Sequence, residues 1–312
     1  MKKLIAAFII GIVLFLGQFS KDGVQNFIGP QQQEKSFDEY GVRAKQDLLC
    51  LWMAYPEEIS SVEKDENNKI YVVMKSGKRI LYDDKKVKTF NEQLANGDLQ
   101  DMMEQIYPLG DIHELLELGY DPGRIRDYDF LKEVYGHSKE QVQSNLTVVK
   151  MGYRNLQFSK KNKADYYLNN VMKELVPLGE ARNDIRICMY PPGGTFNYRY
   201  ISGTGQLSPH SFGIAIDLAK DDRDYWQWAS REAGEKRLQE YPREIVKIFE
   251  KNYFIWGGKW SHFDILHFEY RPELILKSMY FDKEVQPNHP WYEGVPMSDE
   301  NIKGYIDIID GI

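Results

Sequence analysis

The feature that most constrains this chain is a short apolar run, residues 213–218, which carries one carboxylate, Asp217, and follows a histidine, His210. A buried carboxylate is costly unless it is paired or coordinated, so Asp217 is expected to be a ligand. Side chains alternate along a strand, and the odd separation of positions 210 and 217 would put them on opposite faces of one strand. His210 can therefore act with Asp217 only from a turn before the strand, which Pro209 and Gly213 both allow.

A second group of reactive side chains lies in residues 256–269, where Asp264, His267 and Glu269 follow a Gly-Gly-Lys-Trp sequence. His267 and Glu269 share strand parity, so His267 is expected on a strand and Asp264 on the turn before it. Three His or carboxylate ligands with one open position are typical of a catalytic zinc site. Glu269 is then expected to hold a ligand imidazole in one tautomer. The alternative is that Asp264 is an exposed turn residue and Glu269 an ordinary salt-bridge partner.

The composition excludes several other classes of protein. The 312 residues include 40 Lys plus Arg and 47 Asp plus Glu, and this acidic balance argues against general nucleic-acid binding. Two cysteines, Cys50 and Cys188, cannot build a disulfide scaffold, although one disulfide between them is permitted outside the cytoplasm. Of the remaining histidines, His113, His137 and His289 are expected to be surface or packing residues. His262 lies closer to the second group but has no partner at ligand spacing, so it is not expected to be a ligand.

The N-terminus carries a targeting pattern. Met1-Lys2-Lys3 precedes an apolar stretch, residues 4–16, and a basic region before about 7–15 apolar residues is typical of a secretory signal. Residues 1–20 are therefore expected to be a signal peptide or, if they are not cleaved, a membrane anchor, and residues 21–36 a polar tether. The alternative is a buried helix of the globular domain.

The rest of the chain predicts an α+β fold, with a small antiparallel sheet flanked by helices. We expect an N-terminal α+β region of unknown role at 37–144, a domain at 145–285 that holds the chemistry, and a tail at 286–312. The alternative is that the upstream region shares one core with the domain. Periodicity predicts helices at 36–55, 90–118 with a break at Pro108, 163–176 and 237–251, and one or two short helices within 130–149. Strands are predicted at 69–75, 78–82, 185–190, 213–218, 254–256 and 265–270.

The two motifs resemble those of a known family. Ser208-x-His210-x-x-Gly213-x-Ala215-x-Asp217 followed by Asp264-x-x-His267-Phe-Glu269 is similar to the zinc D-alanyl-D-alanine carboxypeptidases. That family includes the vancomycin-resistance carboxypeptidases and dipeptidases, and the L-alanyl-D-glutamate endopeptidases of phage lysins. The resemblance covers about residues 145–285 and implies a Hedgehog/DD-peptidase-like zinc peptidase fold.

The resemblance also implies roles for individual residues. One Zn²⁺ would be held by His210, Asp217 and His267, and Asp264 would be the general base for a metal-activated water. Arg199, in the segment 197–206, would stabilise the oxyanion, unless it is a plain surface arginine. Ser208 and Glu269 are expected not to bind the metal themselves but to contact its ligands and hold them in position.

These residues lead to an expected function. The chain is expected to hydrolyse peptidoglycan stem peptides as a monomer, secreted or anchored to the outer face of a bacterial cytoplasmic membrane. D-alanyl-D-alanine carboxypeptidase activity is the leading interpretation. The alternatives are an L-alanyl-D-glutamate endopeptidase, a dipeptidase acting on free D-Ala-D-Ala, and a non-enzymatic zinc-containing cell-wall binding module. A carboxypeptidase needs a cation for the substrate's free carboxylate, and the candidates are Arg182, Arg186 and Lys259.

Overall fold

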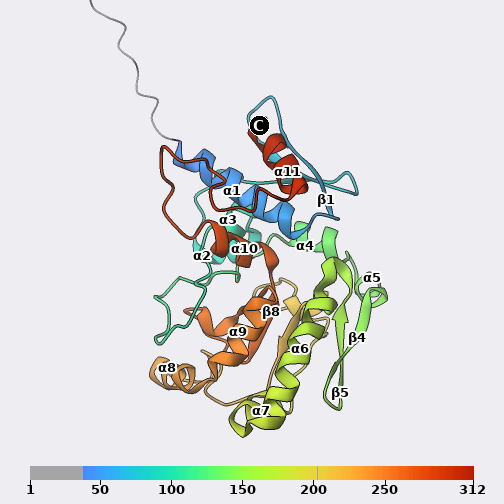
Figure 1. The fold of residues 1–312 in the computed structure, drawn as a ribbon, viewed down its shortest axis with the longest axis vertical. Coiled ribbons are helices and arrows are strands. Elements are labelled where there is room, and N and C mark those ends of the chain that lie inside the picture. Colours follow the sequence, from blue (N-terminus) through green and yellow to red (C-terminus); the bar gives the residue numbers. More distant parts are fainter. Residues whose placement is uncertain (1–37, 202) are drawn as a thin grey trace, which may run out of the picture. The chain divides into compact units, whose positions relative to one another are not determined.

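A computed structural model of the protein describes residues 38–201 and 203–312 (Figure 1). The predicted signal or anchor and the polar tether lie outside these residues. Every helix within the described ranges is too short or too polar to cross a membrane.

The described residues contain both helices and strands. The α-helices are α1 (Glu39–Ala54), α2 (Phe90–Asn96), α3 (Leu99–Met103), α4 (Tyr128–Tyr135), α5 (Lys139–Ser144), α6 (Ala164–Ala181), α7 (Asn183–Met189), α8 (Arg231–Glu240), α9 (Arg243–Lys251), α10 (Pro272–Tyr280) and α11 (Glu300–Asp310). Short 3₁₀ turns are η1 (Lys161–Lys163), η2 (Pro209–Phe212) and η3 (Gly257–Lys259). The strands are β1 (Ile59–Lys64), β2 (Ile70–Met74), β3 (Arg79–Leu81), β4 (Leu146–Met151), β5 (Arg154–Ser159), β6 (Ala215–Asp217), β7 (Phe254–Trp256) and β8 (His267–Tyr270).

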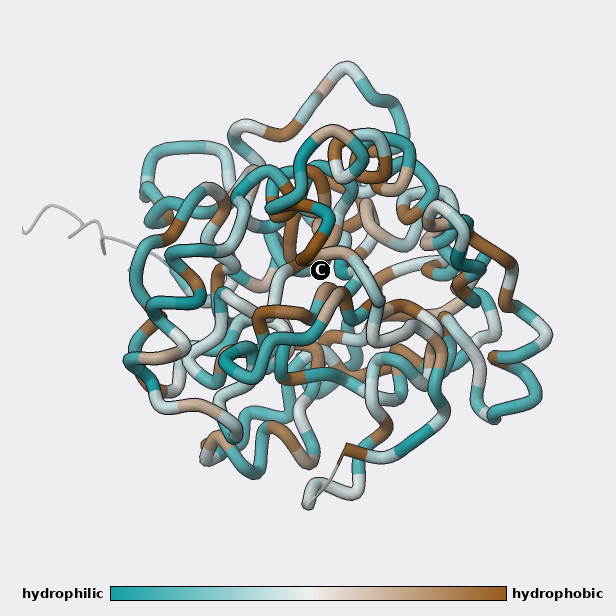
Figure 2. Tube along the Cα trace, turned by 90° about the horizontal axis from the view of Figure 1, so that it is seen from below, coloured by the Kyte–Doolittle hydropathy of each residue, from teal (hydrophilic) through white to brown (hydrophobic). Residues whose placement is uncertain are grey.

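These elements confirm the predicted α+β class. The strands form three small antiparallel sheets, β1-β2-β3, β4-β5 and β6-β8-β7, with helices packed around them. Residues 38–312 form one compact unit, and most of its outer turns are hydrophilic (Figure 2). The domain boundaries expected near residues 145 and 286 stay predictions.

The sheet β6-β8-β7 has one apolar face and one polar face. Side chains alternate along β8, so His267 and Glu269 share one face while Phe268 and Tyr270 point the other way. On the apolar face, Phe268 stacks on Phe249 of α9, with ring centroids 3.9 Å apart. Helix α9 therefore supports the sheet from behind and leaves the face with the titratable groups for the functional site.

The N-terminal region packs on the same core as the C-terminal helices. Helix α1 contacts both α10 and α11, and the three lie together at one end of the molecule (Figure 1). Between α1 and α10, Lys277 Nζ lies 2.6 Å from Asp47 Oδ1 as an ion pair, and the hydroxyl of Tyr82 donates to Asp47 Oδ2 over 2.8 Å. Because this ion pair is fully buried, the two parts of the chain must assemble together.

Several predicted elements are confirmed and others are wrong. The helices α1 and α6, the β2-β3 hairpin and the strands β6, β7 and β8 lie where they were predicted. Residues 185–190 are not a strand but most of helix α7, because the side chains that pack inward are Ile185, Cys188 and Met189, at helical spacing, while Ile187 is exposed.

The other errors have local causes. The helix predicted at 90–118 divides at Gly97 and ends at Met103, whose carbonyl accepts a hydrogen bond from Lys277 instead of from a helical amide. The helix predicted at 237–251 is interrupted by Pro242, which lacks an amide hydrogen. Residues 146–149 belong to β4, where Val148 is exposed and Val149 is buried.

The Lys277–Asp47 pair gives a stability prediction. Lys277→Met leaves a buried carboxylate without its cation, so the free energy of unfolding should fall by about 3–5 kcal/mol in urea titrations. Lys251→Met is the matched control, because Lys251 pairs with Glu174 on the surface; it should cost less than about 1 kcal/mol. Similar small losses in both variants would show that the buried pair does not hold α1 against α10.

Candidate metal centre and its pocket

The first candidate ligand comes from a turn, as the spacing predicted. His210 lies in η2, and Gly213 ends this turn with a positive φ of 68° before β6 begins. A side chain at Gly213 would be strained by this φ and would also meet Leu146. The turn reverses the chain so that His210 and Asp217 face the same space, which strict strand alternation would have prevented.

The second and third candidate ligands are neighbours across two strands. Asp217 on β6 lies directly opposite His267 on β8, which brings their β-carbons to within about 5 Å. His267 Nδ1 lies 2.9 Å from Asp217 Oδ1, and His210 Nε2 lies 3.2 Å from the same oxygen. One ligand atom from each of the three residues lies within 4.8 Å of the others, so the group could hold a metal ion.

The donor atoms are prepared for a cation. His210 Nδ1 lies 2.5 Å from the Thr195 carbonyl oxygen, so Nδ1 carries the proton and Nε2 keeps its lone pair. Burial would raise the pKa of Asp217, but the two imidazoles hold it well below its usual range. Burial would lower the pKa of His267, yet the carboxylates of Asp217 and Glu269 raise it to about 10, so a metal ion would displace a proton from this ring. Two imidazole nitrogens and one carboxylate are a donor set that suits zinc.

Glu269 lies behind His267 and has stronger partners than the imidazole. Its Oε2 is 3.8 Å from His267 Nε2, beyond hydrogen-bond distance. Arg126 donates to both carboxylate oxygens, from Nε over 3.0 Å and from Nη2 over 2.5 Å, and Arg271 lies at 3.4 Å. Burial alone would raise the pKa of Glu269, but Arg126 holds it well below its usual range. The carboxylate is therefore ionised and faces the ring edge of His267 that points away from Asp217.

A cavity of about 320 Å³ opens in front of the three candidate ligands. Its walls contain the candidate ligands together with Arg199, Ser208 and Asp264, but not Glu269. The lining residues are Arg124, Arg126, Arg199, Ile201, Ser208, Pro209, His210, Asp217, Tyr225, Trp226, Trp228, Trp260, His262, Asp264, Leu266 and His267.

Asp264 takes the predicted place before β8. Its carbonyl accepts from the amide of His267 over 3.1 Å, and its own amide donates to Gly257 over 2.9 Å. Burial raises the pKa of Asp264 to about 7, while His267 and Arg124 oppose the rise. A carboxyl group with this pKa can exchange a proton near neutral pH.

Arg199 and Ser208 are held to the His210 turn by backbone hydrogen bonds. The amide of Ser208 donates to the Arg199 carbonyl over 2.9 Å, and the amide of Arg199 donates to Ser211 Oγ over 2.9 Å. Arg199 is exposed at the mouth of the cavity. The structure thus brings both residues to the same cavity as the candidate ligands.

One wall of the cavity was missed by the sequence analysis. Residues 121–126 come from the N-terminal region of unknown role, and they place Arg124 and Arg126 in the cavity. The fully buried carboxylate of Asp121 accepts from the amide of His262 over 2.9 Å and lies 2.7 Å from His262 Nδ1. The local sequence signalled only an Asp-Pro-Gly turn at this point, with nothing to indicate its distant neighbours.

The remaining candidates lie elsewhere. Arg182 pairs with Asp184 and Glu244, and Lys259 is buried against Glu250. Arg182, Arg186 and Lys259 all lie outside the lining of the cavity. Cys50 and Cys188 are buried free thiols. His262 borders the cavity outside the ligand group, whereas His113, His137 and His289 are exposed.

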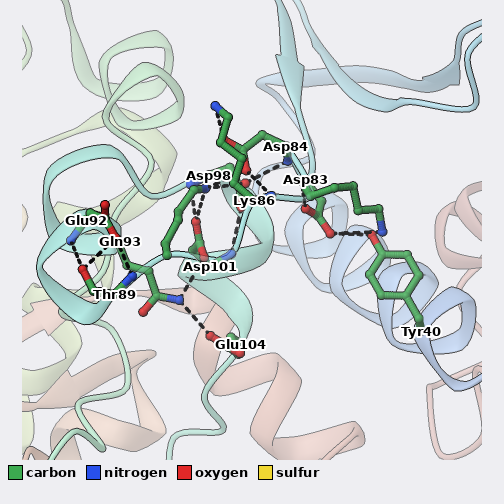
Figure 3. A network of polar contacts seen from close by, with 12 residues as sticks. Tyr40, Asp83, Asp84, Lys86, Thr89, Glu92, Gln93, Asp98, Asp101 and Glu104 are labelled. Carbon is green, nitrogen blue, oxygen red and sulfur yellow. Dashed lines mark hydrogen bonds and ion pairs between the residues drawn. The ribbon is translucent and has the colours of Figure 1, made fainter.

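A second group of carboxylates has a different character. Asp83, Asp84 and Asp98 lie close enough to hold a metal ion, in the polar network that Figure 3 shows. However, the ammonium of Lys88 lies 3.0 Å from Asp84, 2.9 Å from Asp98 and 2.6 Å from Asp101. The ammonium of Lys88 thus supplies the positive charge that a metal ion would otherwise bring to these carboxylates.

Comparison with known families points to the same segment as the site. The model of the D-alanyl-D-alanine carboxypeptidase family matches residues 202–270, less than a quarter of the chain, which includes His210, Asp217, Asp264 and His267. The resemblance noted from the two motifs is confirmed over this range, and the match supports a zinc-dependent peptidase. No curated protein and no solved structure matches the chain.

The donor geometry predicts metal binding that can be measured directly. We expect one zinc ion per chain. His210→Ala should bind zinc about 100-fold more weakly or worse, because the loss of a residue that only hydrogen-bonds to a ligand already lowers metal affinity about 10–100-fold. His289→Ala is the control, because His289 is exposed and pairs with Glu293. Unchanged zinc affinity in His210→Ala, measured by competition with a chromophoric chelator, would contradict this ligand set.

Proposed function

We propose that this protein is a zinc-dependent peptidase that hydrolyses peptidoglycan stem peptides, acting as a D-alanyl-D-alanine carboxypeptidase. The observation that carries the proposal is the convergence of His210, Asp217 and His267 in one cavity that also contains Asp264. We further propose that it acts outside the cytoplasm as a monomer, in keeping with the N-terminal pattern and the family match.

The residues of the cavity divide the chemistry between them. A zinc ion bound to the three ligands would supply a Lewis acid and activate water for attack near neutral pH. Asp264 accepts a proton from the attacking water and passes it to the leaving amine, for which a pKa of about 7 is well suited. Arg199 offers positive charge to the oxyanion that develops on the scissile carbonyl. Thr195 keeps the imidazole of His210 oriented, and Glu269 places a negative charge beside the imidazole of His267.

Two other functions compete with this proposal. An L-alanyl-D-glutamate endopeptidase would use the same chemistry on another bond of the stem. A zinc-containing binding module would need the ligands but not a proton acceptor, and Asp264, with a pKa shifted to about 7, favours an enzyme.

Incubation of the zinc-loaded protein with purified muropeptides, with product masses read by mass spectrometry, tests the proposal. Loss of one alanine indicates a carboxypeptidase, and a cut between L-Ala and D-Glu indicates an endopeptidase. Tight binding without any product would support the binding module instead.

Asp264→Asn tests the proton-transfer role. This variant should keep its zinc but lose about 10²–10⁴-fold in kcat, because the amide cannot accept the proton. Asp222→Asn, at an almost fully exposed carboxylate, should retain full activity. Turnover by Asp264→Asn at the wild-type rate would remove Asp264 from the mechanism.

Arg199→Met tests the oxyanion role. Removal of one stabiliser of the developing charge should lower kcat about 10²–10³-fold. Zinc content should not change, because Arg199 lies outside the ligand group. A variant with normal kcat would show that Arg199 is a surface residue of the cavity mouth.

A further inference from the structure

The cavity contains more positive charge than the proposed catalytic steps use. Three arginines line it among the described residues: Arg124, Arg126 and Arg199. Arg126 is fully engaged, because it donates to both oxygens of Glu269 and, through Nη1, to the carbonyl of Arg124 over 2.8 Å. Arg199 is assigned to the scissile carbonyl. Arg124 is left without a function.

The guanidinium of Arg124 is held in place but is not satisfied. Its Nη1 is buried and has no hydrogen-bond partner among the described residues. The nearest carboxylate oxygen, Asp121 Oδ2, lies 3.5 Å away and already binds Ser261 and His262. A buried charged donor without an acceptor is costly, and such a group in the wall of a cavity is a candidate for ligand binding.

The position of Arg124 allows a ligand to reach it. About a fifth of its side chain, 21%, is exposed, whereas Arg126 is almost fully covered at 5%. Its charge acts on Asp264, whose pKa it lowers against the effect of burial. Its guanidinium carbon lies 5.8 Å from the ring of Phe90, which limits how far the group can swing. The group therefore lies within electrostatic reach of the proposed proton carrier.

A carboxylate is the ligand that fits this donor best. A guanidinium presents parallel N–H groups that match the two oxygens of a carboxylate, and such charged hydrogen bonds are among the strongest in proteins. Both reactions considered above place a free α-carboxylate on the residue after the scissile bond. In D-Ala-D-Ala this is the C-terminus, and in L-Ala-D-Glu it is the α-carboxylate of D-Glu, whose chain continues through the γ-carboxyl.

We propose that Arg124 binds the free α-carboxylate of the residue that leaves, and so selects substrates that carry this group directly after the scissile bond. The inference rests on the proposed peptidase function. It gives the N-terminal region a role in specificity, because Arg124 is carried by the loop 121–126 and not by the segment that matches the family model.

Two matched pairs of substrates test the proposal. One is a stem pentapeptide that ends in D-Ala-D-Ala, as the free acid and as the C-terminal amide. The other is a stem peptide with L-Ala-γ-D-Glu, with its α-carboxylate free or amidated. The pair that the wild-type protein cleaves identifies the source of the carboxylate, and kcat and KM are then measured for both members of that pair.

Wild-type protein should prefer the free acid by about 10–100-fold in kcat/KM, the usual value of a charged hydrogen bond. Arg124→Met should lose this preference, mainly through KM for the free acid, so that acid and amide are cleaved with similar kcat/KM. Arg199→Met should lower the rates for acid and amide alike, which separates the two arginines. Arg154→Met, at an exposed arginine on β5, should behave as wild type.

The preference of Arg124→Met for the free acid over the amide decides whether Arg124 binds the carboxylate. If this variant retains it, or loses activity equally on acid and amide, the inference is wrong while the peptidase proposal stands. Arg124→Gln is a second neutral variant if Arg124→Met does not fold, as judged by zinc content and thermal unfolding.

Failure of the proposed function would look different, because wild-type protein would then cleave neither pair. Calorimetric binding of the same peptides to the zinc-loaded protein decides the inference in that case. Tighter binding of the free acid that is lost in Arg124→Met supports the carboxylate site, and equal binding of acid and amide overturns it.

Discussion

The buried carboxylate of Glu269 is the group on which the site depends. It is completely removed from solvent, which would be strongly unfavourable without compensation. Arg126 and Arg271 supply that compensation, and His267 lies on the same face of β8. Arg126 belongs to the loop 121–126, so the buried carboxylate of Glu269 has its main partner only when the N-terminal region is folded as well. Arg271 also donates to the Gly123 carbonyl over 2.8 Å and closes this arrangement. The candidate metal centre and the N-terminal region are therefore parts of one electrostatic structure.

The antiparallel register of β6 and β8 places two of the candidate ligands, Asp217 and His267, next to each other. Asp217 lies opposite His267, and Ala215 lies opposite Glu269, so Asp217, His267 and Glu269 share one face of the strand pair. The opposite face is filled by Phe268 against helix α9. A shift of the register by one residue would turn the carboxylates into the apolar layer. The packing of α9 consequently selects the same register that brings the candidate ligands together.

The cavity separates charges by their surroundings. His267, between two carboxylates, has a raised pKa, while Asp264 has a pKa near 7 because burial outweighs the cations around it. Carboxylates with different roles can thus lie in one small space, one suited to hold a cation and the other to move a proton. The arginines divide in a similar way, since Arg126 is enclosed and Arg124 and Arg199 are open to the cavity. This division supports a peptidase that recognises a charged substrate, which is the function we propose.

The sequence alone determined how the side chains within each of the two motifs lie relative to one another. The odd spacing of His210 and Asp217 required a turn before a strand, and the parity of His267 and Glu269 placed them on one face, because these rules depend only on local geometry. Local patterns were weaker where helix and strand periods overlap, as at Ile185 to Met189, where packing decided for a helix. The tertiary structure alone decided that Asp121, Arg124 and Arg126 form a wall of the cavity. Their partners, His262 and Glu269, lie about 140 residues further along the chain. The spacing of neighbouring residues cannot predict a contact between a buried guanidinium and a carboxylate so far away in the sequence.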